Sequence, residues 1–80
     1  MKITLMCFSH VKYALGEDEV VMDLEPGATT ADLESRVRAM AEEKLEGIPL
    51  RVSVNRAFVP DDHALADGDE VAFIPPVQGG

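Results

Sequence analysis

Apolar and polar residues alternate from the start of the chain. Between Lys2 and Phe8 every odd position is apolar, and this spacing predicts a strand whose odd residues, Cys7 among them, face a core. Met6 and Phe8 then lie on the opposite face, so that face is apolar where the strand ends. Apolar residues take every second position again from Glu19 to Leu24. This stretch predicts a second strand, antiparallel to the first.

Two stretches carry helical signals. Ser9 is expected to cap a short helix that Gly16 closes. A longer helix is predicted after Thr29, because Thr29 and Asp32 have the spacing of a capping box. This main helix is expected to run towards Gly47. Its predicted apolar stripe consists of Leu33, Val37, Met40, Ala41 and Leu45.

Three more strands are predicted in the second half of the chain. Leu50 to Val54 alternates apolar and polar residues, Asn55-Arg56 suits a turn, and Ala57 to Val59 is a short strand. Glu70 to Ile74 is the last strand. The order strand, strand, helix, strand, short strand, strand predicts an α+β fold of the β-grasp, or ubiquitin-like, type. This fold is a mixed sheet with one main helix packed on one face.

The chain leaves this sheet abruptly after Ile74. Proline has no N–H for a strand ladder, so the two prolines that follow end the strand. The last six residues are Pro75, Pro76, Val77, Gln78, Gly79 and Gly80. They span at most about 20 Å when extended, which is enough to enter a partner's pocket. The two glycines could pass a narrow channel and bring the terminal carboxylate of Gly80 to a reactive centre. We expect residues 1–80 to form a single domain with 75–80 as a flexible tail; the alternative is a frayed end without function.

An apolar patch is predicted at the root of this tail. In a β-grasp sheet the first and last strands are parallel neighbours, so their carboxyl ends share one edge. By the period of two, Met6, Phe8 and Ile74 point outward there, and Phe58 is placed to join them. Exposed apolar patches of this kind mark protein interfaces. The alternative is a satellite cluster covered by the segment from Ser9 to Gly16.

The charge of the chain limits its partners. Seven basic and fifteen acidic residues give a formal net charge of -8, which disfavours nucleic acid and anionic membranes and favours a basic protein surface. Cys7 is the only cysteine, so no internal disulfide can form. Neither a leader pattern nor a long apolar run is present, and a cytoplasmic protein is expected.

Side-chain chemistry offers little else. His10 and His63 have no partners at metal-ligand spacing, so no metal site is expected. Cys7 alternates with inward residues and is interpreted as a small packing group. The sequence has neither a glycine-rich phosphate loop nor a set of nucleophile, base and orienting residue. It does not predict an enzyme that works alone.

The end of the chain resembles a known family. Residues 54–80 closely resemble the C-terminal third of the small, sulfur-carrier subunit of molybdopterin synthase. The specific part of this match is the run Asp-Gly-Asp-Glu-Val-Ala-Phe-Ile-Pro-Pro-Val-Gln-Gly-Gly, residues 67–80. The likeness extends more weakly over the whole chain. It implies that an ATP-dependent activating enzyme adenylates Gly80, and that a sulfur-donor enzyme then provides the sulfur of a C-terminal thiocarboxylate. No bound cofactor is implied.

The resemblance also assigns roles to particular residues. Gly80 is the carrier, Gly79 and Gln78 line the inserted tail, and the tail donates sulfur for the dithiolene of molybdopterin inside the large synthase subunit. The apolar contact positions of the family correspond to Phe8, Phe58 and Ile74. The catalytic groups belong to the partners.

Other functions remain compatible with the sequence. A carrier for thiamine thiazole or tRNA thiolation would use the same tail with another acceptor, although the Pro-Pro-Val before Gln-Gly-Gly favours the molybdenum pathway. A ubiquitin-like tag for protein modification is a third possibility. A plain interaction module with an idle tail is a fourth.

Overall fold

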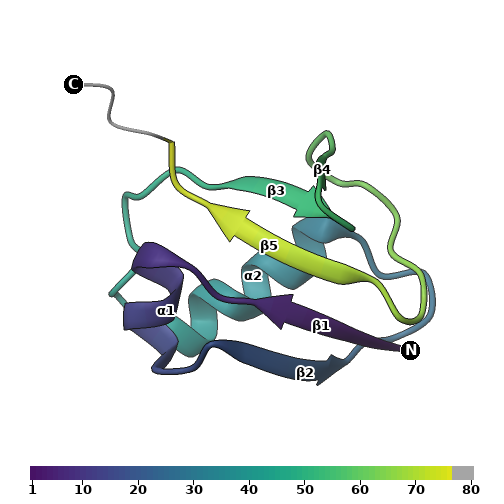
Figure 1. Ribbon diagram of the computed structural model, residues 1–80, viewed down its shortest axis with the longest axis horizontal. Helices are drawn as coiled ribbons and strands as arrows, with labels where there is room; N and C mark the ends of the chain where they lie inside the picture. Colours follow the sequence, from purple (N-terminus) through teal and green to yellow (C-terminus); the bar gives the residue numbers. More distant parts are fainter. Residues whose placement is uncertain (77–80) are drawn as a thin grey trace.

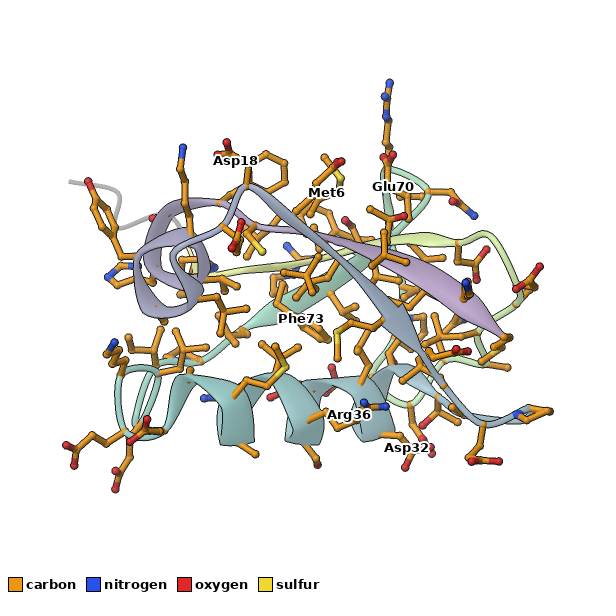
Figure 2. The ribbon with its side chains drawn as sticks, turned by 90° about the horizontal axis from the view of Figure 1, so that it is seen from below. Met6, Asp18, Asp32, Arg36, Glu70 and Phe73 are labelled. Atoms are coloured by element: carbon orange, nitrogen blue, oxygen red, sulfur yellow. The ribbon has the colours of Figure 1, made fainter. Side chains whose placement is uncertain are left out.

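Five strands form one mixed sheet in the order β2-β1-β5-β3-β4. They belong to a computed structural model of the chain, which describes residues 1–76 (Figure 1). The strands are β1 (Lys2–Met6), β2 (Glu19–Asp23), β3 (Arg51–Val54), β4 (Ala57–Phe58) and β5 (Glu70–Ile74), and the helices are α1 (Ser9–Leu15) and α2 (Thr30–Ala41). Helix α2 crosses one face of the sheet, and α1 covers one end of it (Figures 1 and 2). The predicted β-grasp fold is confirmed.

The two central strands, β1 and β5, run parallel. Thr4 lies opposite Glu70 and Met6 lies opposite Ala72, whereas β2 pairs antiparallel with β1, and β3 pairs antiparallel with β5. Parallel strands end at the same edge of a sheet. The segment that follows β1 and the tail that follows β5 therefore leave the sheet side by side, as the sequence predicts.

The core lies between the sheet and α2. Phe73 points from β5 towards the helix (Figure 2) and is fully buried. Each buried Leu, Val, Ile or Phe of this layer contributes about 1.5–3 kcal/mol to stability. Other fully buried side chains are Ile3, Leu5, Val11, Leu33, Val37, Leu45 and Val71. The inward face predicted for the first strand is confirmed, although β1 ends at Met6 instead of Phe8, and the buried Cys7 follows it directly.

Helix α2 begins with the predicted capping box. The Thr29 hydroxyl accepts a hydrogen bond from the Asp32 N–H at 3.4 Å, and the Asp32 carboxylate accepts one from the Thr29 N–H at 2.9 Å. Two N–H groups that a helix start leaves without partners are satisfied in this way. Thr30 then extends the contact to the loop before β5, because its hydroxyl accepts a hydrogen bond from the His63 N–H at 2.9 Å.

The end of α2 differs from the prediction. The helix stops at Ala41 instead of running towards Gly47, because Glu42 takes a left-handed φ of 56°. Arg38 donates hydrogen bonds to the carbonyl oxygens of Leu45 and Ile48, both at 2.8 Å, and so holds the turns that follow. Leu45 reaches the core from these turns. Met40, predicted in the apolar stripe, is 46% exposed.

The start of α1 also differs from the prediction. The N-cap residue is Phe8, with extended backbone and no side-chain cap, and Ser9 is already the first helical residue. The C-terminal prediction is confirmed, because Gly16 has a φ of 74° and its N–H donates to the Lys12 carbonyl oxygen at 2.8 Å. Val11 is the residue that anchors this short helix in the core.

We predict that Thr29→Ala destabilises the domain by about 1 kcal/mol, because the substitution removes the hydroxyl half of the capping box. Urea unfolding followed by circular dichroism measures the change. Ser35→Ala, an exposed substitution inside the same helix, is the matched control and should shift stability by only a few tenths of a kcal/mol. Equal effects of the two substitutions would contradict a role for the cap.

Candidate functional site

An open hollow of about 420 Å³ lies on the face of the sheet that α2 does not cover. Met6 and Glu70, which border it, point away from α2 (Figure 2). The other residues that line it include Phe8, Ser53, Arg56, Phe58, Ala72 and Ile74. The structure thus brings together the four residues Met6, Phe8, Phe58 and Ile74 that the sequence analysis selected.

The strand register explains why the face is hollow. Met6 lies opposite Ala72, Ala72 opposite Ser53, and Ser53 opposite Phe58, so one row of side chains crosses four strands. Its two middle residues are small and its outer two are large. The result is a depression between Met6 and Phe58 whose floor is Ala72 and Ser53, and Arg56 and Glu70 add charged groups to its lining.

The apolar walls of the hollow are open to solvent. Phe8 is 49% exposed and Phe58 is 53% exposed. The alternative of a satellite cluster under residues 9–16 is wrong, because α1 turns its buried residue, Val11, towards the core instead. Large exposed aromatic side chains around a depression are typical of a protein interface. Their role in binding remains a prediction.

The tail begins at the edge of this hollow. Ile74 is the last residue of β5 and is half-buried; Pro75 is half-buried and Pro76 is exposed. The remaining predicted tail residues, Val77, Gln78, Gly79 and Gly80, lie outside the described residues. Any protein that fills the hollow therefore lies beside the point at which the tail leaves the sheet.

A tight turn fixes the end of the hollow formed by β3 and β4. Asn55 and Arg56 have left-handed φ angles of 51° and 71°, a pair typical of a two-residue hairpin. The Asn55 amide donates to the Asp69 carboxylate at 3.0 Å and accepts from the Glu70 N–H at 3.0 Å, which ties the turn to β5. Arg56 lies 3.4 Å from the Glu70 carboxylate.

The sequence analysis missed the polar part of the site. Ser53 and Ala72 form the floor, and the guanidinium carbon of Arg51 lies 4.0 Å from the centre of the Phe58 ring. Counting back by two from the predicted turn at Asn55 places Arg51 and Ser53 on one face of β3. That signal could have found both residues.

The surroundings of Cys7 do not favour a role as a nucleophile. Its thiol is buried, and its sulfur lies 3.9 Å from the Leu5 carbonyl oxygen. Burial raises the pKa of the thiol above its ordinary value, and the negative charges of Asp18 and Glu17 raise this pKa further. The neutral thiol therefore dominates at neutral pH, whereas a nucleophile needs the thiolate.

Residues 1–76 have neither a metal-binding cluster nor a helix that could span a membrane. This part of the chain holds no group of three His, Cys, Asp or Glu side chains that could bind a metal ion. Its two helices are also too short and too polar for either to cross a membrane.

The chain is similar to known proteins along its whole length. Residues 7–80 match the model of the ThiS family. The molybdopterin synthase sulfur carrier subunit of Escherichia coli (strain K12) is 39% identical over 83 residues, with 98% of this chain and 99% of that protein covered. The putative molybdopterin converting factor, subunit 1, from Pyrococcus furiosus superposes with a TM-score of 0.85 at 28% identity, over 96% of this chain and 99% of that one. SAMP1 from Haloferax volcanii gives a TM-score of 0.81 at 26% identity over 100% of both chains.

We predict that the Cys7 thiol of the folded protein reacts with iodoacetamide at least about a hundredfold more slowly than in urea, because it is buried and protonated. Intact mass measured against time gives the rate of alkylation.

The raised pKa of the Cys7 thiol also has a consequence for the stability of the fold. Above about pH 8.5 the unfolded thiol ionises while the folded one does not, so stability should fall as pH rises through this range. Cys7→Ser should lose this fall in stability at high pH. Rapid alkylation of the folded parent would contradict the assignment of Cys7 as a buried, protonated thiol.

Proposed function

Because the chain belongs to the ThiS family, we propose that it is the sulfur-carrier subunit of a molybdopterin synthase. The observation that carries this proposal is its 39% identity, from end to end, with a protein of that name. The position of the hollow supports it, since a carrier must bind its partner close to the root of the tail that delivers the cargo. The cytoplasmic location expected from the sequence is part of the same proposal.

The working group is the terminal carboxylate of Gly80. A carboxylate is a poor electrophile until one of its oxygens becomes part of a good leaving group. An ATP-dependent activating enzyme joins that oxygen to AMP and releases pyrophosphate. The outer sulfur of a persulfide on the donor enzyme then attacks the carbonyl carbon and displaces AMP, which gives an acyl disulfide. A second thiol cleaves the S–S bond of this intermediate and becomes part of a new disulfide with the donor, so that the thiocarboxylate is released. The chain itself needs no bound cofactor for these steps.

The thiocarboxylate is the cargo that the large synthase subunit uses. Its sulfur is a soft nucleophile and needs no activating side chain, which is consistent with the neutral, buried Cys7. The relatives from E. coli and P. furiosus are both named as subunits, and we assign the hollow to the contact with the large subunit. An apolar side chain of that partner fills it while Pro75 and Pro76 direct the tail into the catalytic pocket.

A second candidate differs only in the acceptor. The ThiS family match over residues 7–80 is also compatible with a carrier that serves thiamine thiazole formation or tRNA thiolation. The chemistry at Gly80 would be the same. Sulfur transfer to a molybdopterin precursor with the cognate large subunit separates the two candidates, because a carrier of the second kind gives no dithiolene product.

We predict that ATP, the cognate activating enzyme and a sulfur donor convert the terminal carboxylate into a thiocarboxylate. Intact mass should increase by the difference between sulfur and oxygen, and fragmentation should place the change in the C-terminal peptide. A chain that lacks Gly80 is the control. The same modification in that control would show that Gly80 is not the carrier.

The length of the tail gives a stricter form of this test. One alanine added after Gly80 moves the carboxylate by about 3.5 Å, whereas a misplacement of about 1 Å can already reduce a rate a hundredfold. The extended chain should bind the large subunit and transfer almost no sulfur. Gly79→Ala keeps the length and adds only a methyl group, so it should be partly impaired. Transfer at the parent rate by the extended chain would refute the assignment.

We predict that Ile74→Asp or Phe8→Asp weakens binding to the large subunit at least about 30-fold, because an unpaired charge in an apolar contact costs about 2 kcal/mol or more. Isothermal titration calorimetry measures the affinity, and a thermal melt checks the fold. Met40→Asp is the matched control, since Met40 is 46% exposed but belongs to α2 on the other side of the sheet. Equal losses for all three variants would place the contact elsewhere.

A further inference from the structure

Arg51 is held at the rim of the hollow by an aromatic ring. Its guanidinium carbon lies 4.0 Å from the centre of the Phe58 ring. It is also the first residue of β3, opposite Ile74. A guanidinium stacked on a ring keeps its N–H donors free at its edge and loses little further freedom when it binds a ligand. A fixed positive charge therefore stands at the root of the tail.

This charge has no carboxylate partner within residues 1–76. The ion pairs of that part of the chain involve the N-terminal amine, Lys12, Arg38 and Arg56, but not Arg51. The side-chain hydrogen bonds mapped there do not involve it either. The guanidinium donors of Arg51 are therefore available to another molecule, although the chain has fifteen acidic residues against seven basic ones.

The charges around the hollow are divided between its two sides. Arg56 lies beyond the other end of β3 and pairs there with Glu70, the first residue of β5, at 3.4 Å, whereas Arg51 lies opposite Ile74 at the end of β5. At the β2 side Glu19 lies across from Met6, next to Asp18. The row from β2 to β4 crosses four strand spacings, or about 19 Å. Across the strands, the positive charge of Arg51 therefore lies on the β3–β4 side of this face, and the negative charge of Glu19 lies on the β2 side.

We propose that Arg51, positioned by Phe58, sets the orientation of the docked partner by binding a carboxylate on that partner's surface. This inference rests on the proposed function and makes it more specific. The partner surface that fits the hollow has an apolar side chain for its centre, an Asp or Glu beside it for Arg51, and a basic residue about 19 Å away for Glu19.

Orientation matters because the tail starts at the same place. An apolar side chain in an open depression leaves the partner free to rotate about the contact. A bidentate pair between a guanidinium and a carboxylate at the rim removes that freedom, since both groups are planar. The tail that follows Ile74 then enters the catalytic pocket of the partner in a single direction.

The test is binding of the full-length chain to its cognate large subunit, measured at two salt concentrations. Arg51→Glu should weaken binding about a hundredfold, and the loss should shrink at high salt because the opposing charges are screened. Arg51→Lys keeps the charge without the planar fork and should lose about tenfold. Lys44→Glu is the control, with the same charge change in the turns that follow α2, and should change affinity less than twofold.

Two further measurements test the mechanism. Phe58→Leu keeps an apolar side chain but removes the ring that positions Arg51, so Arg51→Lys should cost much less in that background. Exchange of the partner's acidic residue at this contact for lysine should restore binding to Arg51→Glu. Melting curves of the variants check that each remains folded.

The possible failures can be told apart. If Arg51→Glu binds like Lys44→Glu while Ile74→Asp does not bind, the inference about Arg51 is overturned and the proposed function stands. If the parent chain does not bind the large subunit, the proposed function fails and this inference fails with it. A uniform loss of affinity that no substitution in the partner restores also overturns the inference about Arg51. An ion pair with a carboxylate must be recoverable when the two charges are exchanged.

Discussion

The parallel pairing of β1 with β5 is the constraint on which the rest of the structure depends. Several contacts fix its register where β5 begins: the Gly68 N–H donates to the Lys2 carbonyl oxygen, the Lys2 N–H to the Asp67 carboxylate, and the Thr4 N–H to the Asp69 carbonyl oxygen, at 2.7, 2.7 and 2.9 Å. A slip of one residue would turn Phe73 out of the core and Ala72 into it. The same register that buries Phe73 therefore makes the floor of the hollow.

The two faces of the sheet serve different purposes. The face towards α2 supplies most of the stability, because the large apolar side chains of β1 and β5 are buried there against Leu33 and Val37. The other face carries Phe8 and Phe58 half exposed, at a cost in solubility that the net charge of -8 offsets. An apolar surface on so small a domain is consistent with the proposed docking of a partner on this face.

The sequence predicted the fold well and the site in part. Alternation with a period of two located β1, β2 and β3, turn residues and prolines bounded β4 and β5, and the spacing of Thr29 and Asp32 located the start of α2, because these signals are local. The predicted end of α2 was wrong, because contacts outside the helix decide where it stops. Arg38 donates hydrogen bonds to two carbonyl oxygens in the turns that bring Leu45 to the core. The stack of Arg51 on Phe58 depends on the pairing of β3 with β4, which a pattern of apolar residues does not specify.

The position of Cys7 bears on how a carrier of this kind avoids side reactions. The residue follows β1 at the edge of the sheet where β5 also ends, close to the root of a tail that is proposed to carry an acyl adenylate and then a thiocarboxylate. A thiolate at that edge could compete for the activated carbonyl or for sulfur from the donor. Burial and the neighbouring carboxylates keep the thiol protonated. In the proposed function, the buried and protonated Cys7 would therefore leave the sulfur chemistry to the terminus of the tail.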